Sequence, residues 1–360
     1  MSRSTIAPTP APDRALVFGR PLRVLAWLSF LAEVIIIGTG GAVRLTGSGL
    51  GCTEWPLCTP ESLVPLPEQG FHGIVEFGNR TMTGVVGVLA LAVLFLTLAA
   101  VAGRALVLRA VWFALGGIVA GAVAFAATAA AGLGAFAFSA ALLASVVAAA
   151  VDSVRRAPRR RDLVVLAWLV LAGVMAQAVV GGLAVLTDLN AFVVGFHYTS
   201  SLLLVCVTAA YLERLRAPEG PRERAVPRGV AVLTHVTGLA LAATIFFGVL
   251  TTGSGPHSGD DDIVRTGFDA TVLAHVHSWP GYILLALVVV LLAVAWARSL
   301  PTRTWMLVLL LAIGVQIVVG VIQARTGLPE LLVGTHMVLA ALSAATYTVV
   351  VLRLKRPVAG

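Results

Sequence analysis

The chain has 360 residues, of which 59% are hydrophobic and 12% are charged, and its formal net charge is +8. This composition excludes an ordinary soluble domain and is typical of a polytopic helical membrane protein. In a chain this apolar the positive charge reports membrane topology, so we expect a lipid bilayer around the protein and no nucleic-acid partner.

Ten apolar segments follow one another, each close to the roughly 20 residues that a helix needs to cross a bilayer. We therefore predict an all-α protein with ten spanning helices. The polar, proline-rich residues before the first segment predict a cytoplasmic tail at 1–21 rather than a signal peptide. The predicted helices span residues 22–43, 80–103, 110–130, 133–153, 162–186, 197–213, 229–251, 277–297, 304–324 and 335–354.

The basic residues support this arrangement. With a cytoplasmic N-terminus, all 25 Lys and Arg residues fall on the cytoplasmic side except Arg44, Arg80, Arg265 and Arg325. Cytoplasmic loops of membrane proteins carry such an excess of positive charge. We expect a multi-pass protein of the plasma membrane with both termini in the cytoplasm.

The first long external loop, residues 44–79, contains two cysteines. Cys52 and Cys58 flank the run Thr-Glu-Trp-Pro-Leu. Outside the membrane, such a pair favours a disulfide. A metal site is the alternative, and it would need further ligands nearby.

Glu76 and Arg80 follow at the predicted start of the second crossing. A carboxylate there is either a solvated residue favoured by the helix dipole or a group that handles protons or orients a substrate. The two side chains have the spacing of an ion pair. Alternatively, Arg80 and Arg44 bind the propionates of a haem, because guanidinium groups bind carboxylates through two hydrogen bonds.

Residues 110–153 are rich in alanine and glycine and have arginines on both sides. Both flanks should be cytoplasmic, so we predict an inserted transmembrane hairpin; one long tilted helix with an interfacial piece is the alternative. The proline-rich, charged segment 216–228 predicts a cytoplasmic linker. It separates an N-terminal bundle, 22–215, from a C-terminal bundle, 229–356.

Two stretches of the chain repeat one another at a constant offset of 139 residues. The first runs from Gln177 to His197 and the second from Gln316 to His336. Their matching residues are Gln177, Gly181, Thr187, Leu189, Val194, Gly195 and His197, and Gln316, Gly320, Thr326, Leu328, Val333, Gly334 and His336. The duplication predicts two tandem, pseudo-symmetric four-helix bundles in addition to the hairpin.

Three histidines, His197, His277 and His336, open predicted helices at the outer membrane face. Ionisable residues in spanning helices are functional candidates, and two facing imidazoles bind haem iron from opposite sides. We predict that His277 and His336 bind one haem iron and that His197 binds a second. The alternative for each is a capping or packing histidine at the interface.

In the N-terminal bundle, Asn79 occupies the position of His277, and asparagine is a poor ligand for haem iron. His72 lies seven residues earlier. On a helix that spacing corresponds to about 10 Å along the axis, so His72 is a weak candidate for the second ligand.

Five motifs occur in the order found in the haem A synthase family, and the chain resembles that family. They span Gly40–Cys58, Glu76–Arg80, Gln177–His197, Thr252–Asp260 and Gln316–His336. The resemblance implies an eight-helix core and a structural haem b bound by His277 and His336. It further implies a haem O site near His197, with Glu76 as the important carboxylate, and a disulfide between Cys52 and Cys58.

Members of this family oxidise the methyl group at ring position eight of haem O to a formyl group. The product, haem A, serves terminal oxidases. The resemblance implies links to haem O synthase and to cytochrome oxidase assembly, together with an electron donor that the sequence does not identify. A homo-oligomer is compatible with this reading. Asn79 and the hairpin at 110–153 depart from the usual family pattern.

Two other functions compete with this one. A non-catalytic b-type cytochrome that relays electrons from quinol predicts two equivalent sites, against which the differences Asn79/His277 and Glu76/Ala274 argue. A transporter with tandem repeats needs broken helices at mid-membrane, whereas the polar residues here gather at one outer face.

Overall fold

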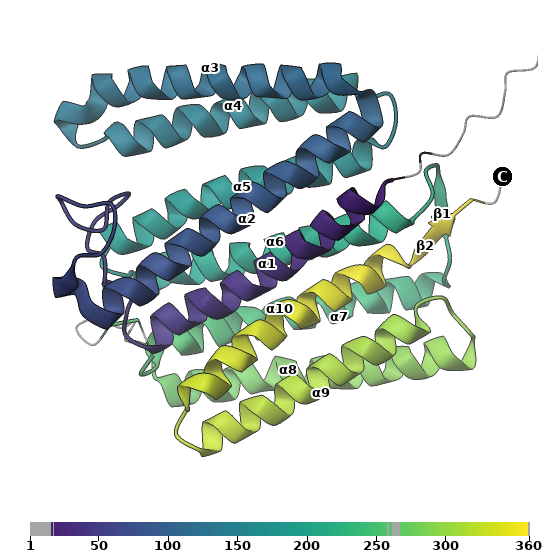
Figure 1. Cartoon of the computed structure of the whole chain (residues 1–360). Helices are drawn as coiled ribbons and strands as arrows, with labels where there is room; N and C mark the ends of the chain where they lie inside the picture. Colours follow the sequence, from purple (N-terminus) through teal and green to yellow (C-terminus); the bar gives the residue numbers. More distant parts are fainter. Residues whose placement is uncertain (1–15, 17, 258, 261–266, 359–360) are drawn as a thin grey trace, which may run out of the picture.

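The structure is a computed structural model, and it describes residues 16, 18–257, 259–260 and 267–358. These residues form ten α-helices and one short two-stranded sheet (Figure 1). All ten helices are long and apolar enough to cross a membrane. The prediction of an all-α membrane protein with ten spanning helices is confirmed. Most of the predicted tail at 1–21, together with Asp261, Asp262 and Arg265, lies outside the described residues.

The elements follow the predicted order. The helices are α1 (Arg20–Leu45), α2 (Gly70–Ala102), α3 (Arg104–Thr128), α4 (Gly134–Arg156), α5 (Arg161–Leu186), α6 (Ala191–Arg216), α7 (Arg228–Ser254), α8 (Ala270–Ala297), α9 (Arg303–Arg325) and α10 (Glu330–Leu352). Two short 3-10 helices, η1 (Pro67–Gln69) and η2 (Ala129–Ala131), precede α2 and follow α3. The strands β1 (Arg222–Arg224) and β2 (Lys355–Pro357) pair antiparallel.

Four helices begin earlier than predicted, all at the end of the molecule that the sequence predicts to be the outer one. α2 starts at Gly70 rather than at residue 80, and α6, α8 and α10 each gain five to seven residues. The prediction that Glu76 and the three histidines open their helices is therefore wrong. Apolar character ends where the helix leaves the hydrocarbon, but the backbone hydrogen bonds continue the helix beyond that point.

The helices assemble into two closed rings of four. α1, α2, α5 and α6 form the N-terminal bundle, and α7 to α10 form the C-terminal bundle. α10 packs against both α1 and α6 and so joins the bundles, as Figure 1 shows near the centre of the molecule. The predicted pair of tandem four-helix bundles is present.

The duplicated sequence forms the same turn in both bundles. The backbone N–H of Leu189 donates to Ala184 O at 2.8 Å, and that of Leu328 donates to Gln323 O at 2.8 Å. Both leucines have positive φ angles, 53° and 60°. The turns align the N-termini of α6 and α10, which carry two of the three histidines.

Residues 110–153 form two helices, as predicted, rather than one. α3 and α4 pack against each other along one side of the N-terminal bundle, where α3 contacts α2 and α4 contacts α5 (Figure 1). Gly117 faces Ser145, and Gly121 faces Phe138 so closely that a methyl group would not fit. Small residues permit such close helix contacts in lipid.

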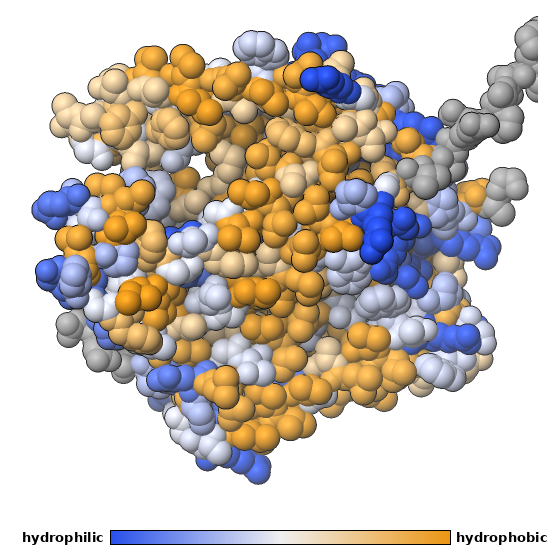
Figure 2. Space-filling model, viewed as in Figure 1, coloured by the Kyte–Doolittle hydropathy of each residue, from blue (hydrophilic) through white to orange (hydrophobic). Residues whose placement is uncertain are grey.

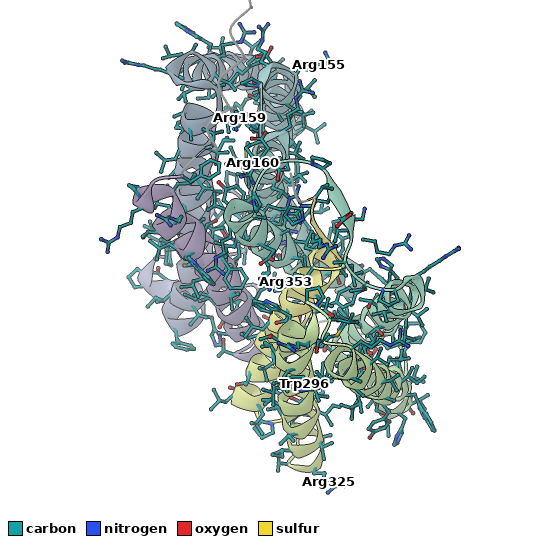
Figure 3. The ribbon with its side chains drawn as sticks, turned by 90° about the vertical axis from the view of Figure 1, so that its right-hand side faces the viewer. Arg155, Arg159, Arg160, Trp296, Arg325 and Arg353 are labelled. Atoms are coloured by element: carbon teal, nitrogen blue, oxygen red, sulfur yellow. A yellow bond between two sulfur atoms is a disulfide. The ribbon has the colours of Figure 1, made fainter. Side chains whose placement is uncertain are left out.

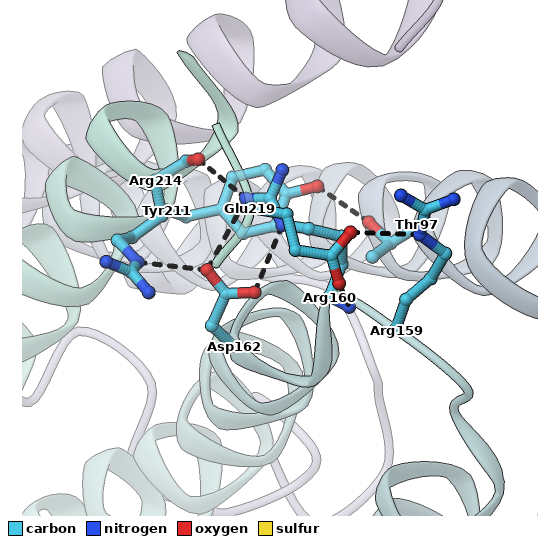
Figure 4. Close-up of polar contacts among 7 residues, drawn as sticks. All are labelled: Thr97, Arg159, Arg160, Asp162, Tyr211, Arg214 and Glu219. Carbon is cyan, nitrogen blue, oxygen red and sulfur yellow. Dashed lines mark hydrogen bonds and ion pairs between the residues drawn. The ribbon is translucent and has the colours of Figure 1, made fainter. Parts of the chain in front are cut away.

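The arginine-rich helix ends gather at one end of the molecule. Figure 3 looks onto this end, where Arg155, Arg160 and Arg353 are labelled. Asp162 accepts hydrogen bonds from Arg160 at 3.2 Å and from Arg214 at 2.9 Å (Figure 4). This network ties the start of α5 to the end of α6.

The sides of the molecule are apolar. Figure 2 shows hydrophobic residues over the flanks of the helices and hydrophilic residues mainly at the two ends. This is the distribution that a bilayer around the helices requires.

Candidate functional site

Each bundle, as far as the structure describes it, has a cavity toward the end opposite the arginine-rich one, which the sequence predicts to be the outer end. The N-terminal cavity has a volume of about 330 Å³ and lies between α1, α2, α5 and α6. The C-terminal cavity, about 140 Å³, lies between α7, α8, α9 and α10. The polar residues around the N-terminal cavity include Glu33, Arg44, Glu76, Asn79, Arg80, Gln177 and His197. Those around the C-terminal cavity include Arg44, His277, Gln316, Gln323, His336 and Ser343.

The three predicted histidines line these cavities at similar depth. His197 and His336 lie six residues after the first residue of their helices, and His277 lies seven residues after the start of α8. At 1.5 Å per residue, each imidazole lies about 9–11 Å from the outer end of its helix. The repeat therefore places them at comparable levels, although inside the helices rather than at their first turn.

Each imidazole packs against a glycine of the preceding helix of its bundle. A Cβ atom at that glycine would approach the ring to between 2.9 and 3.4 Å, so the missing side chain leaves room for the histidine. The pairs are Gly181 with His197, Gly248 with His277, and Gly320 with His336. The repeat included Gly181 and Gly320, but their role became visible only from the contact across helices.

His277 and His336 face each other across the C-terminal cavity. Their ring centres are 6.2 Å apart and the ring planes make an angle of 77°. Metal–imidazole bonds of about 2 Å on opposite sides of one ion place two ring centres about 6 Å apart. The pair therefore has the spacing that suits one iron ion between the rings.

A hydrogen bond uses one ring nitrogen of His277, whereas a ring nitrogen of His336 and the side-chain oxygen of Gln316 are without a partner among the described residues. His277 Nδ1 donates to Thr244 O at 2.8 Å, which orients the ring and leaves Nε2 for a metal. His336 Nδ1 and Gln316 Oε1 are buried and have no hydrogen-bond partner. Buried polar atoms rarely lack partners, so these atoms indicate that the cavity receives a polar or metal-containing ligand.

The N-terminal cavity repeats this pattern. Gln177 Oε1 and His197 Nδ1 are likewise buried without a hydrogen-bond partner. They are the residues that the sequence repeat matches with Gln316 and His336. The same two atoms thus have no partner among the described residues at both sites.

Asn79 occupies in the N-terminal bundle the position that His277 occupies in the C-terminal bundle. It lines the N-terminal cavity, and a Cβ atom at Gly40 of α1 would lie 3.8 Å from its amide group. The hydroxyl of Thr39 donates to Asn79 Oδ1 at 2.8 Å. The asparagine is thus oriented by α1, opposite a glycine, as the histidines are in the other helix pairs.

Glu76 is 5% exposed and connects α2 to the first external loop. Its Oε2 accepts the backbone N–H of Cys52 at 2.6 Å, and its Oε1 accepts from Arg80 Nε at 3.1 Å. Arg80 also donates to Leu57 O at 2.8 Å. The predicted ion pair is formed, and it holds the loop against α2 while both residues line the cavity.

Cys52 and Cys58 form a disulfide, as predicted. Among the residues that the structure describes, no group of three or more His, Cys, Asp or Glu side chains is placed to bind a metal ion. The alternative of a metal site at this cysteine pair therefore finds no additional ligands there.

Arg44 lines both cavities. Its guanidinium donates to His257 O at 2.7 Å and to Thr252 O at 2.9 Å, both in the second half of the chain. These bonds fix the end of α1 to the C-terminal bundle. Because guanidinium has five donor hydrogens, Arg44 retains hydrogen-bonding capacity toward the cavities.

The structure does not bring His72 to the N-terminal cavity. Its side chain is exposed, and Nδ1 is hydrogen-bonded to the hydroxyl of Ser48 at 2.9 Å. Sequence reasoning missed Trp55, which lines the cavity, and Glu33, which lines it from the middle of α1. Trp55 lies in the motif that carried the family resemblance, but nothing local to the sequence indicated its contact with Gly182.

Comparison with known proteins identifies relatives of this chain. A family model described as COX15-CtaA, cytochrome oxidase assembly protein, matches residues 23–133. The heme A synthase of Exiguobacterium sibiricum is 37% identical over 86 residues, 24% of this chain and 28% of that protein. That of Bacillus pumilus is 42% identical over 76 residues, covering 20% and 24%, respectively. The heme A synthase of Geobacillus kaustophilus is 27% identical over 213 residues, 59% of this chain and 46% of the relative.

These matches cover only part of each relative. The chain spans between 24% and 46% of the length of the three curated relatives. The family match includes α1, the first external loop with its disulfide, and α2, and thus Arg44, Glu76 and Arg80.

Proposed function

Because the chain belongs to the haem A synthase family, we propose that it oxidises the methyl group at ring position eight of haem O to a formyl group, giving haem A. The observation that carries this proposal is the repeated cavity. Both bundles contain a space lined by a glutamine and a histidine, and Oε1 of the glutamine and Nδ1 of the histidine have no partner among the described residues. Two porphyrin sites in one chain, one for a resident haem and one for the substrate, match that repeat.

The C-terminal cavity fits haem b. His277 and His336 would hold its iron, since their ring centres are 6.2 Å apart and Gly248 and Gly320 leave room for the imidazoles. The bound haem would supply one-electron transfer to the neighbouring site. Thr244 orients the ring of His277 through the hydrogen bond at Nδ1.

The N-terminal cavity would bind haem O. His197 is positioned to bind the substrate iron, and Arg44 and Arg80 lie at the outer side of the cavity, where they can bind its propionates. The helices around the cavity and the disulfide loop would shield the reacting methyl group from bulk water. The larger volume of this cavity, about 330 Å³ against about 140 Å³, suits the bulkier porphyrin.

Glu76 is the residue that we assign to proton transfer in this site. Oxidation of a methyl to a formyl group moves protons as well as electrons, and a carboxylate that lines the cavity can take part in that proton transfer. Its hydrogen bonds with Cys52 and Arg80 hold Oε1 and Oε2 in defined positions. Arg80 can then stabilise the negative charge after the proton has left.

The two sites are not equivalent, which argues against a non-catalytic cytochrome that relays electrons from quinol. His277 faces His336, but the corresponding position near His197 holds Asn79. The N-terminal site therefore offers one imidazole ligand from the residues around its cavity. A haem held there by one imidazole would be suited to reaction rather than to electron relay alone.

The family and the ten apolar helices place the protein in a membrane, and we propose that its arginine-rich end faces the cytoplasm. Haem O synthase would supply the substrate, and cytochrome oxidase assembly would consume the product. We also propose that the protein receives electrons from a donor, which is not identified, and that it forms a homo-oligomer.

The test uses the full chain expressed in haem-replete cells that make haem O. Extracted haems are separated by chromatography and identified by mass. We expect haem A and haem b from the wild type, and haem O with retained haem b from Glu76→Ala. Glu76→Gln, which keeps an oxygen for the Cys52 N–H, controls for loss of the loop anchor and should also accumulate haem O. Undiminished haem A from both variants would remove Glu76 from the mechanism, and a colourless wild type would refute the proposed function.

A further inference from the structure

Glu33 lies at the deep end of the N-terminal cavity. It is twelve residues before Leu45, the last residue of α1, and so about 18 Å from the outer end of that helix. His197, on the adjacent antiparallel helix α6, lies about 9 Å from the outer end. The carboxyl group is therefore roughly 9 Å deeper in the bundle than the predicted iron ligand.

One oxygen of this carboxyl group is buried without a partner. Glu33 is 2% exposed, and its Oε1 makes no hydrogen bond with any residue that the structure describes. The cavity wall around this depth is mostly apolar and includes Ile37, Val86 and Leu204, and the hydroxyls of Thr83 and Ser201 donate to backbone carbonyls. A carboxyl group in such surroundings is costly unless a hydrogen-bonding group meets it, so the partner must come from the content of the cavity.

The C-terminal cavity has no carboxyl group among its lining residues as the structure describes them. The C-terminal cavity has at its deep end the hydroxyl of Ser343, which is buried without a partner among the residues that the structure describes. A carboxyl group at this depth is thus a difference between the two cavities.

Charge determines which edge of a porphyrin reaches Glu33. The ionised propionates must lie toward the outer end, near Arg44 and Arg80, because charges are expensive within the bilayer. The opposite edge then enters the deep end. In haem O that edge carries a hydroxyl-bearing farnesyl chain, and in haem b it carries a vinyl group with no hydrogen-bonding atom.

We propose that Glu33 is a specificity-determining residue, which hydrogen-bonds the hydroxyl of the substrate's farnesyl-bearing side chain and so selects haem O over haem b in the N-terminal cavity. The inference rests on the proposed function. A site built to bond a hydroxyl rejects an analogue that lacks it, because the buried protein group is then left unpaired. The apolar residues beside Glu33 accommodate the hydrocarbon chain.

The test measures the preference of the N-terminal site for haem O over haem b. Full-chain protein with the C-terminal site filled with haem b is titrated with haem O or haem b, and the change in Soret absorption gives the two Kd values. For the wild type we expect Kd for haem O to be at least about tenfold lower, the effect of one buried hydrogen bond.

Glu33→Leu should reduce this preference about tenfold, leaving the part that comes from the hydrocarbon chain, and Glu33→Gln, which can still bond a hydroxyl, should keep most of the preference. Ser201→Ala is the matched control, because this cavity-lining hydroxyl already donates to His197 O, and the preference should not change. The absorption of the C-terminal haem b reports folding, and Glu33→Ala replaces the leucine variant if that variant does not fold.

A preference for haem O that is undiminished in Glu33→Leu or Glu33→Ala, or a wild type without any preference, overturns the inference. Both results leave the proposed function standing if haem A is made. By contrast, haem O affinity that is unchanged in His197→Ala would overturn the proposed substrate site itself.

Discussion

Gly320 and Gly314 provide a sharp test of the haem b site, because both lie on α9 but only one faces a histidine. A Cβ atom at Gly320 would lie 2.9 Å from Cε1 of His336, whereas a Cβ atom at Gly314 would have no atom within 4 Å. Gly320→Ala therefore forces the imidazole to move by about 0.5 Å to regain an ordinary contact distance of about 3.5 Å. Gly314→Ala forces no movement.

The expected effect follows from ligand geometry. Disturbing the groups that position a metal-bound histidine weakens metal affinity by about 10-fold to 100-fold. We expect the loss of haem affinity in Gly320→Ala to be about 10-fold, near the lower limit of this range, because the ring shifts but the imidazole remains. Both substitutions replace glycine by alanine within a helix and should each gain about 0.5–1 kcal/mol in helix stability. Reduced haem binding by Gly320→Ala would therefore not reflect a weaker helix.

The assay compares the haem b content per protein and the Soret absorption of the wild type and the two variants after identical purification. Titration of apoprotein with haem b then gives the ratio of Kd values, and far-UV circular dichroism reports helix content. Wild-type affinity in Gly320→Ala, or equal losses in Gly320→Ala and Gly314→Ala, would refute the assignment of this glycine as the space for His336.

Two further predictions concern the joint between the bundles and the orientation in the membrane. Arg44→Met removes the hydrogen bonds to His257 O and Thr252 O, and because a hydrogen bond from a charged group contributes about 1.5–3 kcal/mol, thermal unfolding should occur at lower temperature; Arg44→Lys should recover part of the loss, and an unchanged midpoint for Arg44→Met would contradict the role of these bonds. In intact cells, a thiol reagent that does not cross membranes should label Glu68→Cys in the first external loop and spare Glu223→Cys at the arginine-rich end, and the reverse pattern would disprove the cytoplasmic placement of that end.

Much of the fold follows from local sequence because the bilayer imposes the length of each helix. The apolar segments predicted ten helices, and the arginines on both sides of 110–153 predicted a hairpin there. The same criterion placed the start of α2 ten residues too late, at residue 80 instead of Gly70. Hydropathy ends at the edge of the hydrocarbon, whereas hydrogen bonding continues the helix through Glu76 and Asn79 to the loop.

Some features of the site could likewise be predicted from the sequence, whereas others could not. The offset of 139 residues by itself determined that His197 and His336 occupy equivalent places at similar depth, since a duplicated turn and helix repeat their geometry. Only the tertiary structure decided that Gly320 makes room for His336, that Glu76 holds the N–H of Cys52, that His72 lies outside the cavity and that Glu33 lines it. Hydropathy and spacing describe one helix at a time, but these contacts depend on the rotation of each helix against its neighbours, which is settled when all the side chains pack together.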